Sequence, residues 1–159
     1  MPNIIHRNAV RAILLTPAAE ILLMRIRLED RPPFWITPGG GREGDEDSRT
    51  TLVRELSEEV GLQTMEVGPR LWLRRHTFSV GPKRYCQTEE FYAVHVDRFD
   101  PVISDAVEAR VLDSFRWWAL TDLRTLSESV APASLVEIVE TYLRDGPPAG
   151  PLTIEVTED

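Results

Sequence analysis

The sequence predicts an α/β fold in which helices pack on a mixed β-sheet. Several segments alternate apolar and polar residues with the period of two that a half-buried strand requires. Two other segments, at residues 48–60 and 133–144, repeat apolar residues at the spacing of an amphipathic helix. Strands interspersed with helices in this way are typical of a sheet that helices cover.

The first half of the chain is rich in expected strands. Residues 10–16 and 20–27 are apolar or β-branched runs joined by a Pro-Ala-Ala turn, which together predict a β-hairpin. Residues 35–41, with the sequence WITPGGG, predict a short strand that a proline and three glycines stop. Residues 71–80 and residues 89–96 each alternate apolar and polar side chains, and a Gly-Pro-Lys turn lies between the two segments, so we expect two further strands there.

The last third of the chain predicts one more strand and a helix. Residues 115–120 are expected to form the strand, and residues 121–126 a short helical turn. The amphipathic helix begins near Ala133 and ends near Arg144, because Gly146 and two prolines follow. The remaining tail is expected to be a loop with a final extended piece.

The earlier helix has clear start and stop signals. Asp47 is a suitable N-cap for a helix over residues 48–60, and Gly61 can end that helix in the left-handed conformation. Projected at about 100° per residue, its apolar side chains fall on one stripe. The stripe consists of Leu52, Val53, Leu56 and Val60.

The opposite face of this helix gathers charged side chains. Glu55 lies three residues before Glu58 and four before Glu59, so the three carboxylates are neighbours on the helix surface. Two carboxylates about 4 Å apart repel by about 4 kcal/mol at an effective dielectric constant near 20, so a convergent set must take up protons or bind cations. Arg54, on the same face, can neutralise part of the cluster. A divalent metal site is therefore expected.

The ligand types favour Mg²⁺ or Mn²⁺, because oxygen donors without Cys–His spacing do not suit zinc. A calcium loop of the EF-hand type is excluded, since Arg49 and Thr50 stand where a ligand and the glycine are required. A plain solvated acidic face is the alternative, and the close spacing of the glutamates disfavours it. The turn PGGGREG allows close backbone approach, so it can offer a carbonyl to a metal or an amide to a phosphate.

Together these residues resemble the signature of the Nudix hydrolase family. Gly40 is followed after five residues by Glu46 and, after seven more, by the run RELSEEVGL at residues 54–62, with no departure at any defining position. A chance match at seven fixed positions is expected about 10⁻⁷ times in a chain of this length. The segments WITPGG, QTEEFYAV and FRWWAL also resemble the strands that flank this box. The resemblance implies the Nudix fold, an α/β/α sandwich around a mixed sheet, as a single domain over residues 1–159.

The resemblance also implies roles for the clustered residues. Glu58 and Glu59 would be the principal metal ligands, and Glu55 a further ligand or the base that acts on water. Arg54 would orient a glutamate, and the Gly39 carbonyl would be an additional ligand. The bound ions would neutralise a diphosphate, align its phosphorus and make a bound water acidic. The expected reaction is hydrolysis of a nucleoside diphosphate linked to another group.

Residues outside the cluster are weaker candidates. Glu46 is implied to support the loop of the box. A further carboxylate ligand is expected from a loop beyond the box, with Glu108 as the first candidate and Glu89 and Glu90 as its rivals. Each of these three is better explained, on its own, as a structural residue.

Basic and aromatic residues also have two explanations each. The runs RRH at residues 74–76 and KR at residues 83–84 can meet substrate phosphates or form a solvated strand edge. Trp117 and Trp118 point to opposite faces of a strand, so one can stack on a base, although core packing explains both better. Cys86 is explained as an ordinary strand residue.

Length, charge and cysteine content limit the class of protein. The 159 residues suit one domain, and the single cysteine excludes an internal disulfide and fits a reducing compartment. The net charge of −8 disfavours a nucleic-acid polymer as partner, because such polymers are bound chiefly through Lys and Arg. No apolar run suits a membrane span, so we expect a cytoplasmic protein. Exposed strands would allow a homodimer without requiring one.

The predicted function is therefore a Mg²⁺- or Mn²⁺-dependent Nudix pyrophosphohydrolase acting on a small phosphorylated nucleotide. The alternative is a catalytically silent Nudix-fold sensor, and the intact box argues against it. Thr77 stands where a proline would suggest ADP-ribose, and residues 78–80 lack the tyrosine of the dinucleoside polyphosphate group. A nucleoside triphosphate or a nucleotide sugar stays open, and no substrate-binding residue is assigned.

Overall fold

The computed structural model of the protein describes residues 3–102 and 111–159. The strands are β1 (Ile4–Leu15), β2 (Glu20–Leu28), β3 (Arg31–Ile36), β4 (Gly39–Gly41), β5 (Val67–Val80), β6 (Lys83–His95), β7 (Leu112–Ala119), β8 (Ser129–Ala131) and β9 (Ile154–Glu158). The helices are α1 (Ser48–Val60), α2 (Leu120–Arg124) and α3 (Leu135–Asp145). Within the described ranges these strands join one mixed sheet, in the order β8-β3-β2-β1-β6-β5-β9, with β4 beside β1 and β7 beside β2.

Strand β1 is the centre of this sheet. It pairs in parallel with β6 along its whole length, from Ile4 opposite Arg84 to Leu15 opposite His95. The predicted hairpin with β2 is present only at the turn, where Leu15 faces Ile21. Beyond that point the two strands diverge, because β4 pairs with β1 while β2 pairs with β3 and β7.

The glycine run forms a strand rather than only a stop. Gly39, Gly40 and Gly41 make up β4, with Gly39 opposite Arg11 on β1. Their lack of side chains allows this approach, since a Cβ on Gly39 would lie 2.2 Å from the Val10 carbonyl oxygen. Gly39 also has a φ of 143°, which residues with side chains rarely adopt. The predicted stop is present, since β3 ends at Ile36, but the strand that the glycines then form was not predicted.

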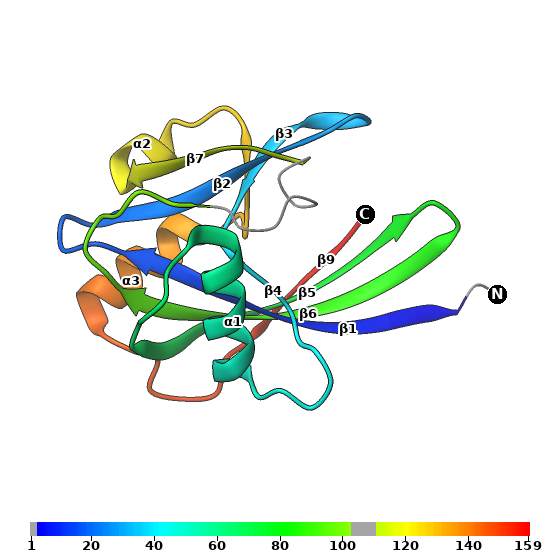
Figure 1. The fold of residues 1–159 in the computed structure, drawn as a ribbon, viewed down its shortest axis with the longest axis horizontal. Coiled ribbons are helices and arrows are strands. Elements are labelled where there is room, and N and C mark those ends of the chain that lie inside the picture. The colour runs from blue at the N-terminus through cyan, green and yellow to red at the C-terminus, as the bar shows by residue number, and fades with distance from the viewer. Residues whose placement is uncertain (1–2, 103–110) are drawn as a thin grey trace.

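Two apolar layers lie on opposite faces of the sheet. One layer joins α1 to β1 and contains Val10, Ala12, Leu14, Leu52, Leu56 and Val60, all of them buried. The other joins α3 to the opposite face and includes Ile13, Leu15, Phe91, Leu135 and Val139. The predicted α/β sandwich with a mixed sheet is confirmed. In Figure 1 the outer ends of β1, β5 and β6 extend past the helices.

Several predicted boundaries hold. Helix α1 spans Ser48–Val60, Asp47 accepts a hydrogen bond from the Thr50 amide at 2.8 Å, and Gly61 has a φ of 76°. The final extended piece is β9, which pairs in parallel with β5. None of the helices in the described part of the chain is long and apolar enough to cross a membrane.

Candidate active site

Two glutamates of α1 are buried against the glycine strand β4. The Gly39 amide donates a hydrogen bond of 2.8 Å to Glu59 Oε2. The Glu55 carboxylate lies against Gly40, where an added Cβ would come within 2.4–2.5 Å of its atoms. Glu55 is only 7% and Glu59 only 6% exposed. The helical projection placed the carboxylates away from the buried stripe of the helix, but β4, whose glycines have no side chains, allows α1 to bury residues on both sides.

Arg54 joins this helix to the loop before it. Its Nε and Nη2 each donate a hydrogen bond of 2.9 Å to the Glu46 carboxylate, and Nη2 also donates to the Gly41 carbonyl at 3.0 Å. Its Nη1 donates to Glu55 at 3.0 Å and to Glu58 at 3.5 Å. The hydrogen bond from Arg54 is the main reason that the pKa of Glu46 falls to about 2. Arg54 therefore fixes both the loop and the glutamate cluster.

The environment of Glu55 disfavours its charged form. Burial raises the pKa of Glu55, although Arg54 acts in the opposite direction. A buried carboxylate with a raised pKa is stabilised as an anion when a cation binds it. Glu58, on the same helix, is half exposed. Among the described residues, no three His, Cys, Asp or Glu side chains converge in the arrangement of a metal site.

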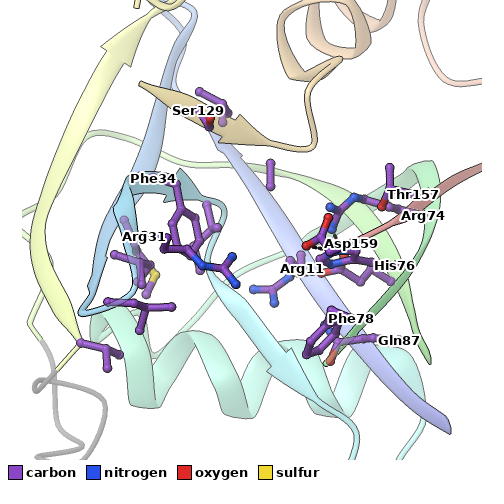
Figure 2. A pocket seen from close by; sticks show the side chains of 18 of the residues that line it. Arg11, Arg31, Phe34, Arg74, His76, Phe78, Gln87, Ser129, Thr157 and Asp159 are labelled. Carbon is purple, nitrogen blue, oxygen red and sulfur yellow. Dashed lines mark hydrogen bonds and ion pairs between the residues drawn. The ribbon is translucent and has the colours of Figure 1, made fainter. Parts of the chain in front are cut away.

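A cleft of about 1030 Å³ reaches this cluster at Glu59, whereas Glu55 and Glu58 are not among the residues that line it. Gly39, Gly40, Glu59 and Arg11 line one part of it, next to α1 and β4. Figure 2 shows Arg31 and Phe34 on one wall and His76 and Phe78 on the other, with Arg11 between them. The volume is at the upper end of the range for small-molecule sites. The site thus combines buried carboxylates with a wide cleft whose described lining is mainly apolar and contains both arginines and carboxylates.

Comparison with known proteins assigns the family. The family model of the NUDIX domain matches residues 5–138, which is most of the chain. This chain belongs to the Nudix family. The resemblance found in the sequence and the fold that it implied are therefore confirmed.

Relatives and solved structures agree with that assignment. An RNA pyrophosphohydrolase of Acidiphilium cryptum is 29% identical over 133 residues, covering 77% of this chain and 80% of the relative. The structure of a MutT protein from Methanosarcina mazei is similar with a TM-score of 0.64 at 22% identity, covering 91% of this chain and 98% of that chain. The NUDIX domain of Shewanella oneidensis NrtR, solved with ADP-ribose, is similar with a TM-score of 0.66 at 18% identity and 90% coverage of both chains.

The residues of the Nudix box lie together, whereas Glu89 and Glu90, the two alternatives to Glu108 as an additional metal ligand, lie outside this cluster. Glu89 is buried between Arg11 and Arg74 and forms an ion pair with each. Glu90 points to the other side of the sheet, where it contacts Ser48 and Arg70. Glu108 lies outside the described residues.

Only some residues of the two basic runs, at residues 74–76 and 83–84, line the cleft. Arg74 and His76 line the cleft, whereas Arg75 does not, because successive strand residues point to opposite faces. Lys83 and Arg84 are also absent from the lining.

Trp117 and Trp118 both pack against the core, as the sequence favoured over stacking on a base. Trp118 is buried in the cluster under α3. Trp117 packs in the cluster under α1 and donates a hydrogen bond of 2.9 Å to the Phe99 carbonyl.

Sequence reasoning missed Arg11 as a site residue of this Nudix domain. Its side chain is 16% exposed, forms the ion pair with Glu89, and donates to the Thr37 carbonyl at 3.2 Å. Burial acts to lower the pKa of Arg11, but the combined interactions with Glu89, Glu59 and Glu55 outweigh it and raise that pKa above its ordinary value. The available signal was the charge itself, because Arg11 interrupts the otherwise apolar run at residues 9–15.

Proposed function

We propose that this chain is a Mg²⁺- or Mn²⁺-dependent Nudix pyrophosphohydrolase that cleaves a nucleoside diphosphate linked to another group. The family and the names of two relatives, both RNA pyrophosphohydrolases, support a hydrolase acting on pyrophosphate bonds. One observation carries the proposal for this chain. Two glutamates are buried against glycine backbone at the edge of a cleft that arginines line.

The donor set suits a hard divalent cation. Glu55, Glu58 and Glu59 offer only oxygen ligands, and we propose the Gly39 carbonyl and Glu108 as additional ones. The close contact between Gly40 and Glu55 supports this assignment, because a side chain at position 40 would displace the Glu55 carboxylate. When bound, the ions would neutralise the diphosphate and make a coordinated water acidic.

The chain's own residues would position the reactants. The Gly39 amide fixes Glu59, and Arg54 fixes Glu55 and the loop that carries Glu46. Glu55, which is buried and has a raised pKa, is our candidate for the base that takes the proton from the attacking water. Arg11 lies beside this cluster and offers its guanidinium to a phosphate oxygen of the substrate.

The substrate has two candidates. A small nucleotide, such as a nucleoside triphosphate or a nucleotide sugar, fits the acidic net charge of the chain. The 5′ end of an RNA is the second candidate, because the relatives from Acidiphilium cryptum and Rhodospirillum rubrum are RNA pyrophosphohydrolases. Arg11 and Arg74 offer cationic groups to a phosphate in this cleft, although its described lining contains four carboxylates as well as four arginines.

The test is chromatographic product analysis with a panel of nucleoside triphosphates, nucleotide sugars, dinucleoside polyphosphates and 5′-triphosphorylated RNA. Each is incubated with Mg²⁺, with Mn²⁺ or with a chelator. We expect cleavage that the chelator abolishes. Absence of cleavage across the panel, together with a nucleotide that raises the melting temperature, would replace the enzyme with the sensor alternative.

A further inference from the structure

A buried charge triad lies in the cleft outside the Nudix box. Both oxygens of the Glu89 carboxylate are engaged, one by Arg11 Nε and the other by Arg74 Nη1 at 2.6 Å. The side chains are 16%, 4% and 13% exposed for Arg11, Glu89 and Arg74. Two guanidinium groups share one carboxylate, so the triad has a net charge of +1.

Three nitrogen atoms of the triad stay available as hydrogen-bond donors within the described part of the chain. Among the described residues, no hydrogen-bond acceptor contacts Arg11 Nη2, or Nε and Nη2 of Arg74. Both arginines line the cleft. Planar guanidinium groups held in place are well suited to bind phosphate oxygens, because little conformational freedom is lost on binding.

Strand register places the triad beside the glutamate cluster. Arg11 on β1 is opposite Gly39 on β4, and that glycine's amide holds Glu59. Glu89 on the next strand is opposite Arg74 on β5. Neighbouring strands are about 4.8 Å apart. The triad therefore begins one strand spacing from Gly39, whose carbonyl is a proposed metal ligand, and it continues across the sheet to Arg74 on β5.

We propose that Arg11 and Arg74, held in position by Glu89, bind a phosphate beyond the diphosphate that is hydrolysed. The proposal rests on the proposed function and narrows its substrate to a nucleotide with at least three linked phosphates, of which a triphosphate is the simplest. A nucleotide sugar has no such third phosphate and leaves the triad's donors unused. The triphosphate of a free nucleotide and that at the 5′ end of an RNA present the same chemistry to this site.

Glu89 is a positioning residue in this scheme, because it touches the two arginines and not the substrate. This role replaces its earlier candidacy as a metal ligand, since both of its oxygens are already paired. Its neighbour Glu90, on the opposite face of the sheet, provides a matched control.

The first experiment is calorimetric binding of inorganic tripolyphosphate and pyrophosphate to the full chain, with and without Mg²⁺. We expect the wild-type chain to bind tripolyphosphate at least about tenfold more tightly than pyrophosphate. Arg74→Ala should remove this difference, whereas Arg75→Ala, on the other face of the same strand, should keep it. Arg74→Lys should restore only part of it, because a lysine keeps the charge without the planar fork.

The second experiment is steady-state kinetics with a nucleoside triphosphate, a 5′-triphosphorylated RNA dinucleotide and a nucleotide sugar. Arg74→Ala should raise KM for both triphosphates about tenfold, with kcat little changed and the nucleotide sugar unaffected. Glu89→Gln should act in the same direction and Glu90→Gln should not. The triphosphate with the higher kcat/KM identifies the source of the phosphate.

The outcomes separate this proposal from the proposed function. Equal binding of the two inorganic probes, or equal effects of Arg74→Ala and Arg75→Ala, would overturn the phosphate site. Selective tripolyphosphate binding without turnover of any substrate would keep the phosphate site and reject the hydrolase. A melting temperature measured for each variant identifies any that fails to fold, and Arg74→Lys then takes the place of Arg74→Ala.

Discussion

Glu58 is the half-exposed member of the glutamate cluster, and it offers the cleanest test of the metal assignment. Glu58→Gln removes one negative charge and keeps the shape of the side chain. We expect kcat to fall about 100-fold or more, because metal-assisted charge stabilisation contributes several kcal/mol. The melting temperature should stay close to that of the wild type. Full activity that still needs Mg²⁺ would refute the ligand role.

The matched control for that experiment is Glu66→Gln. Glu66 is exposed on the segment between α1 and β5 and does not line the cleft, so its substitution makes the same change of charge outside the site. Its kcat should equal that of the wild type.

Glu46 connects the box loop to Arg54, and its pKa of about 2 makes a prediction about stability and pH. A carboxyl group with a lowered pKa stabilises the folded state above its unfolded pKa near 4.5, and this stabilisation is lost as the pH falls toward 2. Glu46→Gln should therefore lower the melting temperature at pH 7, with a difference from the wild type that shrinks between pH 4.5 and pH 2. A difference that is constant over this range would show that the charge of Glu46 does not stabilise the fold.

At the scale of elements, the contact between β4 and α1 determines the geometry of the site. Gly40→Ala would place a methyl group within 2.5 Å of the Glu55 carboxylate. We expect the free energy of unfolding to fall by about 1–3 kcal/mol, because the helix must move, together with a large loss of kcat. Denaturant unfolding and steady-state kinetics measure the two effects.

The neighbouring glycine is the control. An added Cβ on Gly41 would meet nothing closer than 3.9 Å, so Gly41→Ala should change the free energy of unfolding by no more than about 0.5 kcal/mol. Equal effects of the two substitutions would mean that backbone freedom, and not the space for Glu55, explains the glycine run.

At the scale of the whole molecule, the net charge of −8 predicts that a long RNA gains little from its length. We expect kcat/KM for 5′-triphosphorylated RNA to change no more than about twofold between a dinucleotide and a 20-nucleotide chain, because each further phosphate contact needs its own Lys or Arg. The plot of log kcat/KM against log salt should have a slope on the order of −1 to −2. A steep rise in kcat/KM with length would contradict the expectation that no nucleic-acid polymer is a partner.

Local patterns in the sequence predicted the parts of the fold that local chemistry controls. Asp47 and Gly61 bound α1 as expected, because capping and left-handed termination depend on residues a few positions away. The glutamate spacing and the family signature came from the same stretch. Half of β6 was missed, since Lys83–Thr88 lies beyond the helices and lacks the alternation that one covered face produces.

The sequence by itself determined the family and the glutamate cluster, since these depend on identities and spacings within a single segment, and the α/β class, since it depends on local periodicities along the chain. Tertiary structure alone decided that Glu55 and Glu59 are buried, because this needs the approach of β4 to α1. It also decided that Arg11, Glu89 and Arg74 meet, although Arg11 and Glu89 are 78 positions apart in the sequence. Pairing between distant strands brings them together, and the register of that pairing cannot be read from any one strand.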